Sequence, residues 1–212
     1  MPNLPISGLP TGGTLDGTEL FAMVQDGVTK QTSLNSLYTS LSSNYGLFNQ
    51  TGDSTPVLGN APTGSLIDGG AGTLSVPANG FKVGDAFTAN FHGKLTAVQN
   101  HTLEIHIESD GTNLADTGVI TIPNVTNKDW TLNIDFSINA IEAAGVAEIA
   151  SAGTFTFRTN SAGDVVTEIF SSVNNTTFDT TIDNTLVVKA IWANSNASDS
   201  IYSRIFTLRK TY

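Results

Sequence analysis

The sequence predicts an all-β protein in which two packed β-sheets follow an extended N-terminal arm. Three observations support this fold class. Charged residues make up 13% of the 212-residue chain, against roughly 25% in an ordinary globular domain, and Thr, Asn, Ser and Gly take their place. Apolar and polar residues alternate in many short segments beyond residue 73. Turn signals separate these segments at intervals of about 8–12 residues, as in a sandwich or barrel.

Residues 1–45 are expected to form an arm that attaches to a partner. Pro2, Pro5 and Pro10, together with several Gly residues, disfavour regular structure at its start. Apolar side chains spaced among such residues cannot build a core of their own, so we expect them to lie in grooves of a partner. These residues are Leu4, Ile6, Leu9 and Leu15.

The second part of the arm has the pattern of a β-hairpin followed by a short helix. Strand-like segments over residues 20–24 and 28–31 flank Asp26-Gly27, a strong hairpin-turn signal. Ser33 can cap a helix. One apolar stripe at i, i+3, i+4 and i+7 follows it, formed by Leu34, Leu37, Tyr38 and Leu41. The hairpin residues expected to contribute to attachment are Leu20, Phe21, Val24 and Val28.

Two further zones follow the arm. Residues 46–72 are rich in Gly, Pro, Thr, Ser and Asp, which is typical of a linker or a loosely packed stalk. Residues 73–212 are expected to form a globular head of about eight strands in two packed sheets. Gly145 interrupts residues 141–150, so we expect an irregular connection there and not a helix. The clearest alternating segments are 103–107, 130–138, 154–158, 186–192 and 205–209.

The composition excludes several classes of function. Nine Lys and Arg against nineteen Asp and Glu give a net charge of −10, which repels nucleic-acid phosphates and anionic membranes. No apolar run approaches the ~20 residues needed to cross a bilayer, and residues 1–10 lack the features of a secretory signal. Cysteine is absent, so disulfides are excluded. We expect synthesis in a cytoplasm, with no nucleic-acid or membrane partner.

Two regions resemble proteins of virus particles. The segment ISGLPTGGTLDGTELFAMVQDGVTKQTS, residues 6–33, resembles the start of bacteriophage tail-fibre, head-fibre and appendage proteins, where it attaches the molecule to the particle. The segments SVPANGFKVGDAF, ADTGVI and NNTTFDTTIDNTL, residues 75–87, 115–120 and 174–186, resemble heads of phage and large-virus fibre-like proteins. The resemblance covers most of the chain. It implies a trimeric jelly-roll head in a virion assembled in the host cytoplasm, with capsid, neck or tail proteins as partners.

The sequence carries no pattern that indicates catalysis. His106 shares a strand face with Glu104 and Glu108 and could join them around a metal ion, but a solvated strand face is the simpler interpretation. Motifs of hydrolases, nucleotide-binding proteins and zinc proteases do not occur. The acids considered for glycoside hydrolysis mostly fall in predicted turns, and they are Asp110, Asp116, Asp135 and Asp164. We expect no enzyme activity, no cofactor and no metal.

Contact of the head with a host surface glycan is a further expectation. Trp130 and Trp192 could stack on sugars, but both fit the alternation of a strand, which favours packing in the core. The Asn- and Ser-rich segment 194–200 is a better contact surface. Two other classes stay open: a carbohydrate-binding module, which would not need the arm, and a capsid cement protein, whose head would clamp neighbouring capsid subunits.

Apolar residues on both faces of two strands predict a homotrimer. In one strand, Val187 and Ile191 lie opposite Val188, and the apolar residues of the last strand do not keep to one parity. A monomer would expose such residues as an apolar patch. We assign the trimer interface to Val187, Ile191, Tyr202 and Phe206. The alternative is a sandwich in which β-bulges shift the alternation, so that these residues belong to the core.

Overall fold

The computed structural model describes residues 20–25, 27–33, 47–161 and 164–211. The chain divides into two compact units, residues 1–44 and 45–212. The described part of the first unit is a hairpin, and that of the second is a β-sandwich. Within these ranges all regular secondary structure is strand, and no helix is long and apolar enough to cross a membrane.

The hairpin predicted in the arm is confirmed. Strand β1 (Leu20–Gln25) pairs antiparallel with β2 (Val28–Ser33), and the first pair after the turn is Gln25↔Val28. This register leaves a two-residue connection, in which Gly27 has a φ of +73° that glycine adopts without strain. Ser33 is the last residue of β2, and the helix expected after it, residues 34–41, lies outside the described residues.

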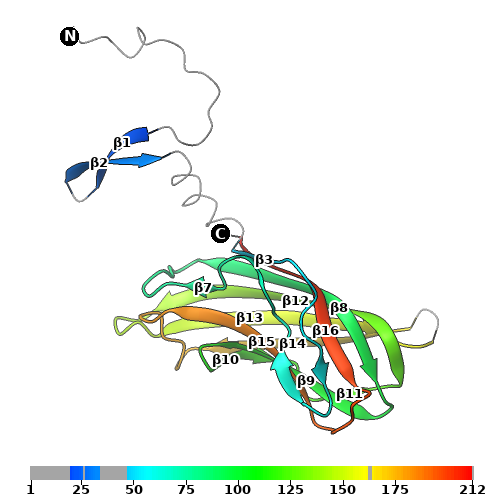
Figure 1. Ribbon diagram of the computed structural model, residues 1–212. Coiled ribbons are helices and arrows are strands. Elements are labelled where there is room, and N and C mark those ends of the chain that lie inside the picture. Colours follow the sequence, from blue (N-terminus) through cyan, green and yellow to red (C-terminus); the bar gives the residue numbers. More distant parts are fainter. Residues whose placement is uncertain (1–19, 26, 34–46, 162–163, 212) are drawn as a thin grey trace, which may run out of the picture. The chain divides into compact units, whose positions relative to one another are not determined.

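The second unit is a sandwich of two antiparallel sheets, which confirms the predicted all-β class (Figure 1). The larger sheet has eight strands in its described part, ordered β14-β13-β12-β8-β16-β3-β6, with β4 also paired to β16. Its long strands are β8 (Ala86–Ala97), β12 (Val125–Ile141), β13 (Ala147–Arg158), β14 (Val165–Asn174) and β16 (Ser200–Lys210). Its short strands are β3 (Phe48–Gln50), β4 (Val57–Leu58) and β6 (Gly70–Gly72).

The smaller sheet has six strands in its described part, ordered β10-β9-β15-β5, with β11 paired to β9 and β7 paired to β15. Figure 1 shows β9, β10 and β15 facing the long strands of the larger sheet. Apolar residues of the two inner faces form one buried core. The strands are β5 (Thr63–Ser65), β7 (Ser75–Val76), β9 (His101–Ser109), β10 (Thr112–Asp116), β11 (Ile120–Ile122) and β15 (Asn184–Trp192).

A row of aromatic rings crosses the inner face of the larger sheet. Neighbouring rings lie at centroid distances of 5.6, 4.1, 6.4 and 5.7 Å along the row. Each ring comes from a different one of five adjacent strands, so the row joins parts of the chain that are far apart in sequence. Large aromatic side chains dominate the free energy of such cores. In order across the sheet the rings belong to Phe48, Phe206, Phe91, Trp130 and Phe155.

A β-bulge in β16 changes the alternation of the last strand. Ser203 pairs with Gly93 and Ile205 pairs with His92, which leaves Arg204 as the extra residue. Arg204 and Ile205 are therefore both exposed, and the residues on either side of the bulge return to the core. The bulge explains why the apolar residues of this strand do not keep one parity.

The bulge is held by Trp130. Its indole Nε1 donates to the carbonyl oxygens of Lys94 and Tyr202, at 3.1 and 3.2 Å. The indole packs closely against Gly93, where a Cβ atom would clash with the carbonyl of Tyr202 and come within 2.7 Å of Nε1. Because Gly93 has no side chain, the buried indole of Trp130 has room to form the hydrogen bonds that its N–H group needs.

The prediction of a linker over residues 46–72 is wrong for the residues described there. This segment contributes β3, β4, β5 and β6 to the two sheets. Leu66 is fully buried, and Gln50 Nε2 donates to Ser203 Oγ at 2.9 Å. Gly72 has a φ of +106°, and a Cβ there would clash with the carbonyl of Leu47. The glycines allow close backbone packing and do not provide a flexible tether.

The connection expected over residues 141–150 is also shorter than predicted. Strand β12 continues to Ile141 and β13 begins at Ala147, so only a tight turn separates them. Gly145 has a φ of +88° in this turn, and its backbone accepts a hydrogen bond from Thr180 Oγ1 at 2.7 Å. The glycine that interrupts the pattern therefore marks a hairpin turn.

We expect Leu66→Ala to lower the free energy of unfolding by about 2–5 kcal/mol, because a fully buried leucine would be replaced by a cavity. Denaturant unfolding followed by tryptophan fluorescence measures this loss. Leu58→Ala is the matched control in the same segment, since Leu58 is exposed and should cost less than about 1 kcal/mol. Equal effects of the two substitutions would contradict the packing of residues 47–72 into the sandwich.

Candidate functional site

The hairpin presents apolar side chains to solvent. Leu20, Phe21 and Val28 are 65%, 43% and 57% exposed. These are three of the residues predicted to attach the chain to a partner. The backbone of a fourth, Val24, pairs with Thr29. The remaining predicted anchoring residues lie outside the described residues, namely Leu4, Ile6, Leu9 and Leu15.

The four residues predicted at a trimer interface do not form one surface. Phe206 is fully buried in the aromatic row, so its assignment to an interface is wrong, and the bulge in β16 is the physical reason. Tyr202 is half-buried on the outer face of the larger sheet. Val187 and Ile191 are half-buried on the outer face of the smaller sheet, paired with Glu108 and Glu104.

The outer face of the smaller sheet carries a network of charged side chains. Lys189 Nζ lies 2.6 Å from Glu108 Oε2. His106 Nε2 lies 3.0 Å from Glu104 Oε1, but this contact lacks hydrogen-bond geometry. Among the described residues, no three His, Asp or Glu side chains converge as metal ligands. Glu104, His106 and Glu108 are half-buried, and His106 Nε2 is buried without a hydrogen-bond partner among the described residues, so the strand face is less solvated than the sequence predicted.

The acids considered for glycoside hydrolysis have separate structural surroundings. Asp116 accepts hydrogen bonds from the Gly118 amide and the Asn113 amide group, within its own loop. Asp135 accepts a hydrogen bond from Thr88 Oγ1 at 2.7 Å on the outer face of the larger sheet. Asp110 lies in a turn with a φ of +44°, and Asp164 closes a turn onto the carbonyl of Ser161.

The two candidate sugar-stacking residues are core residues. Trp130 and Trp192 are buried, as the alternation predicted, and Trp192 Nε1 donates to the carbonyl of Val57 at 3.1 Å. The loop over residues 194–200 is fastened at its base. Asn194 Oδ1 accepts from the Thr102 amide, and the buried Asp199 carboxylate lies 2.6 Å from His101 Nδ1. Several of the polar groups expected to face a glycan therefore have partners within the protein.

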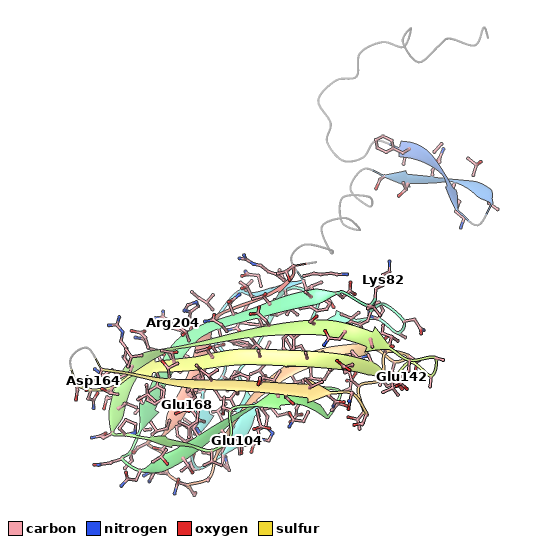
Figure 2. The ribbon with its side chains drawn as sticks, turned by 180° about the vertical axis from the view of Figure 1, so that it is seen from behind. Lys82, Glu104, Glu142, Asp164, Glu168 and Arg204 are labelled. Atoms are coloured by element: carbon pink, nitrogen blue, oxygen red, sulfur yellow. The ribbon has the colours of Figure 1, made fainter. Side chains whose placement is uncertain are left out.

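A polar hollow lies on the outer face of the larger sheet, beside the bulge in β16. Its volume is about 360 Å³, and it is lined by residues from β8, β12, β16 and the loop after β3. Arg204, labelled in Figure 2, lies 3.5 Å from Asp53 across this hollow. The ion pair, an imidazole and a hydroxyl provide donors and acceptors in one shallow depression. The lining also includes His92, Asp129, Thr131 and Ile205.

Electrostatics in this hollow are set by an ion pair on its rim. Asp129 Oδ1 lies 2.6 Å from Lys94 Nζ. The hydrogen bond from Lys94 holds the pKa of Asp129 below its ordinary value, and the charges of Lys94, Arg158 and Arg204 act in the same direction. The carboxylate is therefore ionised across the physiological range. A neutral polar ligand fits this balance of charges better than a strong anion does.

Strand β14 carries apolar residues that the sequence analysis did not single out. On its outer face, Val165, Ile169 and Val173 are all exposed, and Ile169 is 82% exposed. Thr167 and Ser171 alternate with them on the same face. The period-2 pattern of β-branched residues over 165–173 was the available signal for a strand, and a free apolar face could have been inferred from it.

We expect Lys94→Met to raise the pKa of Asp129 towards 3.8, because the substitution removes both the hydrogen bond and the nearest positive charge. Titration of the Asp129 carboxyl carbon by NMR measures the shift. Lys82→Met is the control, since Lys82 is not among the charges that lower the pKa of Asp129. Lys82 lies just before β8, at the opposite end of the sandwich from Asp164 (Figure 2). An unchanged Asp129 pKa in the Lys94 variant would contradict the assigned cause.

No family model and no curated protein matches this chain. A search of solved structures finds the winged bean acidic lectin in complex with methyl-α-D-galactose. The two chains are 13% identical over 95% of this chain and 96% of the lectin, with a TM-score of 0.30. A likeness at this level carries no argument about function.

Proposed function

We propose that this chain is a non-enzymatic structural protein of a virus particle: a fibre or appendage that the N-terminal arm attaches and whose sandwich projects from the particle. The observation that carries the proposal is the hairpin, which exposes Leu20, Phe21 and Val28 in a unit separate from the sandwich core. The resemblance of residues 6–33 to phage attachment segments agrees with it.

The physics of a hairpin supports an attachment role. A two-stranded hairpin is at best marginally stable in water, because it has no second layer to bury its apolar face. Here both strands pair over their full length, yet the apolar side chains of Leu20, Phe21 and Val28 stay exposed. Covering them with a partner surface would remove apolar area from water and stabilise the hairpin. Capsid, neck or tail proteins are the proposed partners.

A jelly-roll topology for the sandwich is part of this proposal. It is supported by the pairing of the first long strand, β8, with the last, β16, and of β9 with β15, which places the start and end of the roll side by side in both sheets. Strands β12, β13 and β14 follow one another within the larger sheet as a meander. In the proposed jelly roll, β8, β9, β15 and β16 are the outer turns, and β12, β13 and β14 extend the larger sheet beyond β8.

Contact with the host is proposed for the sandwich surface, and the polar hollow is its best-defined candidate. The hollow combines the Arg204–Asp53 ion pair with the hydroxyl of Thr131 and the imidazole of His92. Such groups can exchange hydrogen bonds with the hydroxyls of a host surface glycan. The particle is assembled in the host cytoplasm, which suits a chain without cysteine.

We expect a chain that starts at Tyr45 to fold but to be lost from particles, because it lacks the hairpin. A full-length chain with Leu20→Asp, Phe21→Asp and Val28→Asp should be lost in the same way, since charges replace the exposed apolar contacts. Immunoblotting of purified particles measures incorporation. Near-UV circular dichroism checks that the sandwich is intact.

Ile205→Asp is the control for this experiment, because Ile205 is an exposed apolar residue on the sandwich. It should leave incorporation unchanged. A cement protein would instead bind particles through its sandwich, so normal incorporation of the truncated chain would refute attachment by the arm. A carbohydrate-binding module would bind glycan without entering particles at all.

A further inference from the structure

Strand β14 is a long edge strand of the larger sheet, and β10 of the smaller sheet lies close to part of it. Its ten residues pair with β13 in unbroken register, from Arg158↔Val165 to Ile149↔Asn174. In the described part of the chain, no strand pairs with its other edge. It contains no proline, no lysine and no bulge, three of the features that prevent edge-to-edge association. Its one charged residue is Glu168.

The other sheet edges are protected by their form. Strand β6, at the far end of the larger sheet, has three residues, and so does β5 at one edge of the smaller sheet. Strand β10, at the other edge of the smaller sheet, has five residues and a bulge between Asn113 and Ala115. Short or bulged strands are poor templates for pairing. Within the described ranges β14 alone combines length with regular register.

The outer face of β14 is free of charge. Its side chains read Val165, Thr167, Ile169, Ser171 and Val173, and all five are exposed. The charged residue of the strand, Glu168, lies on the opposite face. Figure 2 shows Glu168 between Asp164 and Glu142, nearer to Asp164. For a chain of net charge −10, an uncharged strip of this length is where two copies approach with least repulsion.

The order of these side chains is symmetric about Ile169. An antiparallel strand with the same sequence, centred on that residue, would place Ile169 against Ile169, Val165 against Val173, and Thr167 against Ser171. Every pair on this face then joins residues of the same kind: aliphatic with aliphatic and hydroxyl with hydroxyl. Cross-strand pairs of this type stabilise antiparallel sheets.

The opposite face of β14 is compatible with the same register. There, Glu168 would lie against Phe170 of the second copy, and Val166 against Ser172. The two Glu168 carboxylates would not lie directly opposite each other, so the register avoids a like-charge pair. A two-fold axis requires that a surface be complementary to itself, and β14 meets this requirement over nine residues from Val165 to Val173.

We propose that a second copy of this chain binds at β14, with the two strands pairing antiparallel about a two-fold axis at Ile169, in place of the three-fold assembly predicted from the sequence. The larger sheets of the two copies then form one continuous sheet. At the end of the strand, Asn174 Nδ2 donates to the carbonyl of Asn113 in β10, at 3.1 Å. This contact closes the sandwich beyond Val173, so the pairing segment ends there. The proposed pairing of two copies at β14 does not depend on attachment of the arm to a virus particle.

Ile169→Lys tests the proposal, because it places two positive charges at the two-fold axis. Light scattering on the full-length protein should give twice the 22.2 kDa mass of one chain, at about 10 μM. The variant should give the single-chain mass. Ile169 is 82% exposed, so the substitution should not disturb folding. Val119→Lys is the control, since Val119 is 70% exposed on a loop and should leave the dimer intact.

Cysteine substitution tests the register. The chain has no cysteine, and side chains at directly opposed positions lie close enough for a disulfide. Ile169→Cys should therefore form a covalent dimer on mild oxidation. Val165→Cys alone should form little, but a mixture of Val165→Cys and Val173→Cys chains should cross-link to each other.

Each possible result either supports or overturns the proposed pairing. A dimer that Ile169→Lys dissociates and Ile169→Cys cross-links supports the pairing. A wild-type monomer at this concentration overturns it, and so does any oligomer whose mass Ile169→Lys leaves unchanged. A trimer that Ile169→Lys dissociates would overturn the two-fold arrangement. None of these results bears on incorporation into particles, so failure here is distinguishable from failure of the attachment proposal.

Discussion

The sandwich depends on the row of aromatic rings across the inner face of its larger sheet. The row runs from β3 to β13 and includes the closely stacked pair of Phe91 and Phe206, at 4.1 Å. It therefore ties the first strand of the second unit and the last strand of the chain to the central strands. A fold organised by contacts so distant in sequence pays a large loop-closure entropy before the core forms. Concentrating the largest side chains on one line offsets that cost.

The bulge in β16 and the segment before β8 depend on each other. The bulge turns Arg204 and Ile205 outwards, and Ser203 next to it exchanges hydrogen bonds with Ser54 and Gln50. The bonds with Ser54 satisfy the backbone N–H and C=O groups of Ser203. Residues 47–72 are consequently held against the sandwich, with β3, β4 and β6 in the larger sheet and β5 in the smaller one. The same bulge also shapes the polar hollow, since Arg204 forms one of its walls.

The regular alternation of apolar and polar residues made the long strands predictable, whereas the short strands of residues 47–72 carry no such pattern and were not predicted. The predicted segments 103–107, 130–138 and 186–192 lie within strands β9, β12 and β15, because each alternates over several residues with one face buried. The hairpin was equally clear, since Asp26-Gly27 is a local turn signal. Strands of two or three residues leave no period to detect, so residues 47–72 resembled a linker.

The candidate sites were harder to predict than the strands, because they depend on pairing partners. Phe206 was assigned to an interface because the broken alternation of the last strand fits either a second apolar face or a β-bulge, and the sequence does not choose between them. The structure has the bulge, which reverses the face of every residue beyond it, so the alternative that placed Phe206 in the core is the correct one. The polar hollow brings together Asp53, Asp129 and Arg204. These residues are far apart in the sequence and become neighbours only in the folded protein. The burial of Trp130 and Trp192 was predictable, because each continues a clear period of two.

A surface with few charges makes exposed apolar residues more informative about partners. Most of those on the sandwich occur singly on separate loops or at the bulge, as is normal for soluble proteins. These are Val83, Val98, Val119, Ile182 and Ile205. Only the hairpin and β14 gather several on one strand or strand pair within the described residues, and both also present backbone groups at a free edge. Directional backbone hydrogen bonds can then supply the specificity that surface charges provide in other proteins. The two surfaces differ in the partner they suit: β14 is complementary to itself, whereas the hairpin has no such symmetry and fits a surface of different sequence.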